Sequence, residues 1–177
     1  GWLGKKVVDE NLAVVKVTIH MLVALVIAAL PMLILAKLKK EKIVAGSLLK
    51  NLSVIALLLL LVQIIVGTDV REQIDEIAKP LRYEQRELWI ANLDTIFLIH
   101  RSFSWIVAAA CIFLYWKSRS IPSLKGHNVF ILSFVGVSIV TGLIMYYLQV
   151  PAIAQPVHLF SASLLAISLF SFRLQLK

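Results

Sequence analysis

The chain has 177 residues, of which 60% are hydrophobic, and its mean hydropathy is +0.89. A soluble domain of this size has too little interior to bury so much apolar surface, so the composition excludes a water-soluble globular protein. The formal net charge of +8 does not indicate nucleic-acid binding, because the basic residues are concentrated between long apolar segments.

Five segments are long and apolar enough to cross a bilayer as helices, at about 20 residues per crossing. In chain order they are residues 15–36, 48–67, 94–116, 128–147 and 152–172. The stretch 68–93, which mixes acidic and basic residues, is predicted to be a loop. We therefore predict an all-α membrane protein with five transmembrane helices.

Lysines and arginines gather at three places, which all fall on one side of a five-helix arrangement. They are Lys37, Lys39, Lys40, Lys42 and Lys50; Lys117, Arg119 and Lys125; and Arg173 and Lys177. The positive-inside rule assigns this side to the cytoplasm and the amino end to the outside. His127, in the second of these connections, is expected to be solvated, and Trp89 is expected to anchor a helix end at the membrane surface.

Three histidines, His20, His100 and His158, each lie just inside one end of an apolar segment. Small residues follow them four and eight positions later, on the same helix face: Ala24 and Ala28, Ser104 and Ala108, Ala162 and Ala166. An imidazole beside an open shelf at membrane depth is typical of an axial haem ligand. One such histidine is explained equally well by an interhelical hydrogen bond. Three at one predicted depth favour haem ligation, with His100 and His158 on one iron.

Two arginines are candidates for binding haem propionates. Arg101 follows His100, about 100° further round the helix, and it either reaches a propionate or extends to the membrane surface. Arg71 follows the predicted end of the second helix and is the other candidate. The single cysteine, Cys111, lies inside the third helix and is expected to contribute only packing.

Residues 4–20 resemble residues 142–158, at an offset of 138. Both stretches are predicted to run through a short link into a helix with a histidine near its start. If the repeating unit is four helices, residues 48–177 form a complete second half and 37–47 a cytoplasmic connection. Residues 1–36 would then be the link and last helix of a first half. The expected architecture is a four-helix haem-binding bundle plus one remnant helix of a preceding pseudo-repeat.

Several stretches together resemble the haem A synthase family, the membrane enzymes that convert haem O to haem A for terminal oxidases. They are Gly-Trp-Leu-Gly at 1–4, Val-Thr-Ile-His-Met at 17–21, Gly-Thr-Asp-Val-Arg-Glu-Gln-Ile-Asp at 67–75, Arg-Glu-Leu-Trp at 86–89, His-Arg-Ser-Phe-Ser-Trp at 100–105 and Gln-Pro-Val-His at 155–158. The resemblance covers essentially the whole chain.

The resemblance implies two four-helix halves. His100 and His158 would be the axial ligands of a haem b in the second half, and His20 a ligand in the first half, where haem O would bind. The implied reaction oxidises the C8 methyl of haem O to a formyl group, giving haem A. The family's other first-half ligand, its nearby acid and its external cysteine pair have no match here. The chain by itself is therefore expected to be an incomplete active unit.

By the same resemblance, the protein belongs in a bacterial plasma membrane with its haem sites toward the outer face. The implied partners are haem O synthase, terminal oxidase assembly and membrane lipid, with no nucleic acid; a homo-oligomer is left open. Two other readings remain open. A di-haem cytochrome b-type electron carrier would place haems near both faces, and a non-haem scaffold or transporter would use the histidines only to join helices.

Overall fold

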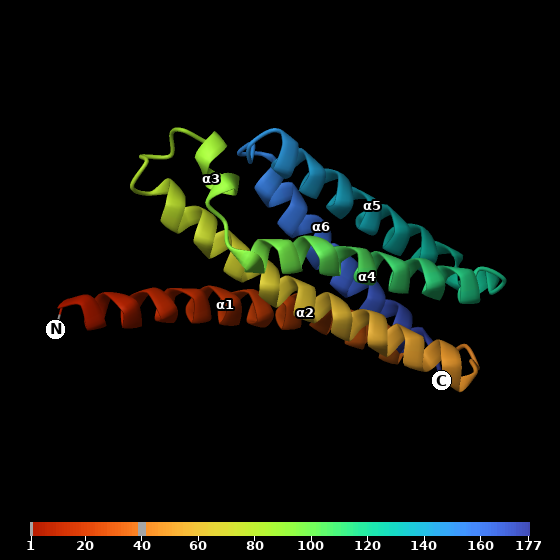
Figure 1. The fold of residues 1–177 in the computed structure, drawn as a ribbon. Helices are drawn as coiled ribbons and strands as arrows, with labels where there is room; N and C mark the ends of the chain where they lie inside the picture. The colour runs from red at the N-terminus through yellow and green to blue at the C-terminus, as the bar shows by residue number, and fades with distance from the viewer. Residues whose placement is uncertain (1, 39–41) are drawn as a thin grey trace.

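The computed structural model describes residues 2–38 and 42–177, with side-chain surroundings from residue 15 onward apart from residue 17. Its helices are α1 (Trp2–Leu38), α2 (Ser47–Ala78), α3 (Glu87–Ala91), α4 (Thr95–Ser118), the 3₁₀ turn η1 (Pro122–Leu124), α5 (Lys125–Tyr147) and α6 (Ala154–Gln175) (Figure 1). Five of these helices, in the described ranges, contain stretches long and apolar enough to cross a membrane. The prediction of an all-α, multi-pass membrane protein with five such helices is confirmed.

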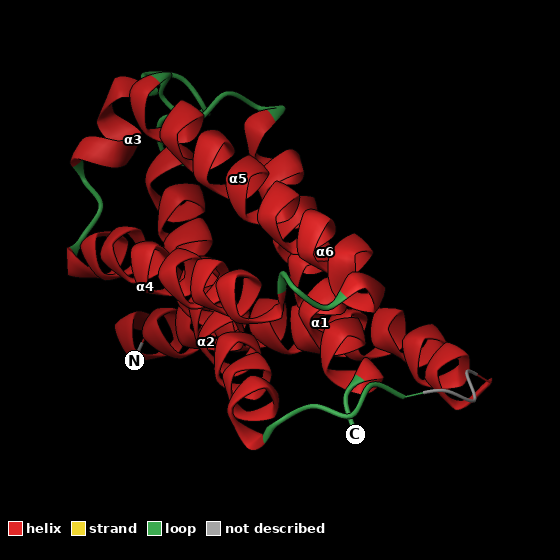
Figure 2. Cartoon of the chain, turned by 90° about the vertical axis from the view of Figure 1, so that its right-hand side faces the viewer, coloured by secondary structure: helices red, strands yellow, loops and turns green. Residues whose placement is uncertain are grey.

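Four of the helices form a bundle, and α1 lies outside it. Helices α2 and α5 each pack on both α4 and α6, so α4 and α6 occupy diagonal corners of the bundle. Helix α1 packs on α6 and α2 (Figures 1 and 2). It is continuous from Trp2, so the link predicted before residue 15 is helical instead.

The carboxyl terminus is tied to the connection between α1 and α2. The Ile43 amide donates to the Gln175 carbonyl at 2.8 Å, and the Lys177 amide donates to the Ile43 carbonyl at 2.9 Å. These hydrogen bonds and the α4–α5 turn lie at one end of the bundle, opposite α3 and the α5–α6 turn (Figure 1). The described lysines and arginines of these connections therefore gather at one end, as predicted, whereas Lys39 and Lys40 lie outside the described residues.

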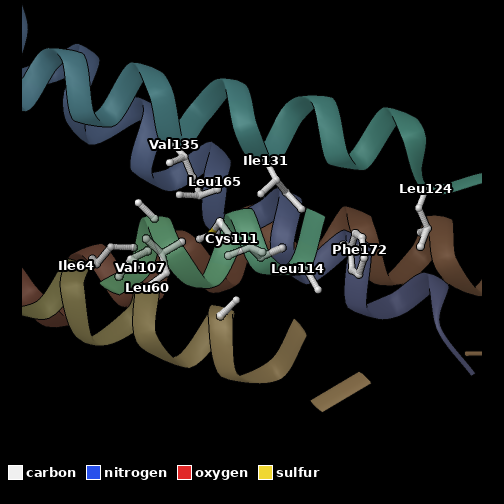
Figure 3. Packing of buried hydrophobic residues seen from close by; sticks show 14 of the residues in the cluster. Leu60, Ile64, Val107, Cys111, Leu114, Leu124, Ile131, Val135, Leu165 and Phe172 are labelled. Carbon is white, nitrogen blue, oxygen red and sulfur yellow. The ribbon is translucent and has the colours of Figure 1, made fainter. Parts of the chain in front are cut away.

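The core runs along the bundle axis and contains small residues as well as leucines (Figure 3). Ala56, Ala108 and Cys111 are almost or completely inaccessible to solvent. Small side chains at helix contacts allow close approach in a bilayer, where apolar side chains gain little from leaving lipid. Cys111 thus contributes to packing, as expected.

The predicted end of the second helix at residue 67 is wrong. Helix α2 continues to Ala78 because Val70, Ile74 and Ala78 recur every four residues and are buried. With Trp89 and Val150 they form a second buried cluster, called here the cap cluster. Trp89 is also not a surface anchor, since it is 4% exposed and its indole N–H donates to the Glu84 carbonyl.

His127 does not lie in a solvated loop, and that prediction is wrong as well. The α4–α5 connection is short, so α5 begins at Lys125 and His127 falls in its first turn. Its Nε2 lies 3.2 Å from the Ser171 hydroxyl, and its ring packs edge-on to Phe172. His127 therefore joins α5 to α6 at the end of the bundle away from the other histidines.

Candidate functional site

Two of the three predicted histidines face each other across the bundle. His100 comes from α4 and His158 from α6, the diagonal helices, and their ring centroids are 6.4 Å apart with the planes at 65°. Each enters near the start of its helix, so both lie between the main core and the cap cluster. The shared depth predicted from the sequence is thus a direct juxtaposition of two imidazoles.

Each of these rings lies against a glycine of a neighbouring helix. A Cβ built on Gly67 of α2 would come within 3.0 Å of His100 Cε1, and one on Gly142 of α5 would lie 3.6 Å from His158 Cε1. The first distance is tighter than ordinary contact between carbon atoms and the second is ordinary. Glycine at position 67 therefore makes room for the His100 ring.

His158 is held by hydroxyl groups on α5 and α6. The Thr141 hydroxyl lies 3.0 Å from His158 Nδ1 and 2.7 Å from the Val137 carbonyl. When its single hydrogen is donated to that carbonyl, the hydroxyl accepts from the Nδ1–H tautomer of His158, and Nε2 then carries the free lone pair. The Ser161 hydroxyl donates to the His158 carbonyl at 2.8 Å and is itself 2.8 Å from the Ser138 hydroxyl. A metal-binding histidine requires one ring nitrogen held by a hydrogen bond and the other left free, as the contact with Thr141 allows here.

His100 is held by a buried amide on α2. Gln63 donates from Nε2 to the His100 carbonyl at 3.0 Å, and the same nitrogen lies 3.2 and 3.4 Å from the two ring nitrogens. Gln63 is only 8% exposed, and within the described chain its Oε1 has no hydrogen-bond partner.

Arg71 and Arg101 lie at the same end of the bundle, but their guanidinium groups make different contacts. Arg71 is inside α2, not beyond it, where it pairs with Asp75 at 3.0 Å and donates to Gln155 Oε1 at 3.1 Å. It thereby joins α2 to the start of α6, three residues before His158. Arg101 packs its guanidinium over the Tyr146 ring at 5.3 Å. It lines an open pocket of about 490 Å³, as does Asp94.

His20 is not brought to this pair. It lies on α1, its side chain is exposed, and it makes no hydrogen bond or ion pair with the part of the chain that is described. Those same residues contain no group of three or more His, Cys, Asp or Glu side chains that would hold a metal ion unaided.

The COX15-CtaA family, described as cytochrome oxidase assembly protein, matches residues 1–170. The chain belongs to this family. No curated protein and no solved structure matches it. Membership confirms the resemblance drawn from the sequence and supports a role in cytochrome oxidase assembly.

In this member of the COX15-CtaA family, the sequence pointed to the histidines but not to the residues that hold them. Gln63, Gly67, Thr141 and Gly142 were all missed. A usable signal existed for one of them, because Gln63 is an isolated amide deep in an apolar segment and stands one helical turn before Gly67. Thr141 gave no signal, since threonine is common in membrane helices.

Proposed function

We propose that this protein is a haem A synthase, which oxidises the C8 methyl of haem O to the formyl group of haem A. We further propose that His100 and His158 are the axial ligands of a haem b in the bundle formed by α2, α4, α5 and α6. The observation that carries the proposal is the pair of facing imidazoles in a member of a cytochrome oxidase assembly family.

The residues present fit that group. Two imidazoles that face each other from opposite helices would hold the iron of such a group between them, and the iron would supply one-electron exchange. The centroids of His100 and His158 are 6.4 Å apart. The pairing of Thr141 with His158 Nδ1 leaves Nε2 free to bind.

Haem supplies one-electron exchange at its iron, and the protein supplies the setting for it. His100 and His158 would hold the iron, and Gly67 leaves space beside the His100 ring. Arg71 and Arg101 are the proposed propionate partners, because both present guanidinium groups at the same end.

The exposed His20 would serve a separate site for haem O, with an opposing surface that α1 does not provide. We place the lysine-rich end in the cytoplasm of a bacterial cell and the histidines toward the outer face. The proposed partners are haem O synthase, which would supply the substrate, and the terminal oxidase assembly, which would receive the product.

The test is the haem content of the protein purified in detergent, measured by pyridine haemochrome and reduced-minus-oxidised spectra. His100→Ala and His158→Ala should each remove one haem B, whereas His20→Ala should leave it in place. His127→Ala is the matched control, since that histidine lies at the other end of the bundle. Unchanged haem B in both of the first two variants would reject the assignment. Haem B with neither haem O nor haem A would favour the di-haem electron carrier. Absence of any haem would favour the non-haem scaffold or transporter.

A further inference from the structure

Gln63 is a costly residue for the place it occupies. It is buried in the middle of α2, between the core residues Leu60 and Ile64. An amide in a membrane interior loses its water and must find partners within the protein. Gln63 finds only some of them, because in the described residues its Oε1 has none. Packing alone therefore does not account for an amide here.

Among the described residues, the hydrogen bonds of the Gln63 side chain are all with His100. One amide hydrogen reaches the His100 carbonyl at 3.0 Å, which anchors the side chain to α4. The nitrogen is also nearly equidistant from the two ring nitrogens, at 3.2 and 3.4 Å. An atom that close to both lies over the face of the imidazole and not along either lone pair, because lone pairs point outward in the ring plane.

The ring is thus confined from α2 at two points one helical turn apart. Gln63 covers its face, and Gly67 lies against Cε1, where even a methyl group would crowd it. His158 is held differently, by the Thr141 hydroxyl 3.0 Å from its Nδ1. The 65° between the two ring planes is therefore set on one side by Thr141 and on the other by Gln63.

We infer that Gln63 is a positioning residue that fixes the plane of the His100 imidazole, and with it the angle between the two axial ligands of the haem. The inference rests on the proposed haem ligation. Ring orientation and second-shell contacts tune both the affinity for a metal and its electronic state. Gln63 does not itself touch the iron in this assignment, and it acts through His100.

Gln63→Met is the decisive variant, because methionine keeps the length and flexibility of the side chain but has no amide. Removing a half-satisfied amide should lower the thermal unfolding temperature by no more than the tenfold weaker haem binding accounts for, since no complete hydrogen-bond network is lost. The same variant should shift the largest g value of the ferric haem in electron paramagnetic resonance spectra. Haem affinity should also fall about tenfold, as for other second-shell changes.

Asn128→Leu is the matched control. Asn128 is also a buried amide, but it binds the Ser118 hydroxyl at the other end of the bundle. This variant should lower the unfolding temperature and leave the g values unchanged.

The possible outcomes distinguish failure of the Gln63 inference from failure of the proposed haem ligation by His100 and His158. A wild-type protein without haem, or one that keeps its haem in His100→Ala, would overturn the haem assignment and this inference together. Haem lost in His100→Ala but unchanged g values and affinity in Gln63→Met would overturn the inference alone. An unfolded or strongly destabilised Gln63→Met protein would also overturn it, because that result would make Gln63 a structural residue.

Discussion

Replacing Gly67 by alanine tests the site through a single carbon atom. The new Cβ would lie 3.0 Å from His100 Cε1, whereas carbon atoms in contact prefer about 3.5–4.0 Å, so the ring must move by roughly 0.5 Å. Metal–ligand distances tolerate only about 0.2 Å. Overpacking of this kind costs about 1–3 kcal/mol, which corresponds to roughly a 5- to 150-fold loss of haem affinity.

Gly142→Ala is the matched control for this change. Its Cβ would lie 3.6 Å from His158 Cε1, an ordinary contact, so that ring need not move. Both substitutions remove a helix-interior glycine, and both should gain up to about 1 kcal/mol of helix propensity. The two variants therefore differ mainly in whether the new Cβ displaces the facing histidine ring.

The assay is haem retained per protein after gel filtration, measured by pyridine haemochrome alongside thermal unfolding. Gly67→Ala should fold and lose haem, and Gly142→Ala should fold and keep it. Equal retention in the two variants, or greater loss in Gly142→Ala, would refute the reasoning that the close contact at Gly67 sets the position of the His100 ring.

Two further predictions concern the frame around the site. Asn128→Ala breaks the 2.9 Å hydrogen bond to Ser118 and should cost about 0.6–1.7 kcal/mol, as interhelical bonds in membranes do; an unchanged unfolding temperature would contradict this. Arg86→Ala removes a 2.9 Å bond to the Val150 carbonyl and a cation–π contact with Trp89. Because Val150 adopts a strained positive φ of 55°, amide hydrogen exchange in the α5–α6 turn should accelerate. Unaltered exchange there would show that Arg86 does not hold the turn.

The sequence was sufficient for the number of membrane-spanning helices and for placing His100 and His158 at one depth. Hydropathy depends only on composition along the chain, and two helices that enter from one side place equivalent positions at equal depth. The partners Gln63 and Thr141 were not predictable in this way. Which side chains of α2 and α5 meet the histidines depends on how each helix is rotated about its axis, and that rotation is set by packing across the whole bundle.

The end of α2 was missed for a different physical reason. Hydropathy reports where a segment leaves the apolar part of the bilayer, and at Gly67 it falls. The helix itself continues, because Val70 and Ile74 keep the helical spacing and find the cap cluster to pack on. Trp89 was misassigned for the same reason, since the cluster that buries it exists only when α2 extends that far.

The contact between Gly142 and His158 has no counterpart in the other copy of the internal repeat, Gly4 and His20. Gly142 and His158 are 16 positions apart in sequence, yet they touch because the α5–α6 turn folds one helix back on the other. Gly4 and His20 have the same spacing but lie on one continuous helix, α1. At 1.5 Å per residue they are about 24 Å apart along it. Gly4 therefore cannot be the shelf for the His20 ring, and any haem held at His20 must find its opposing surface on another helix.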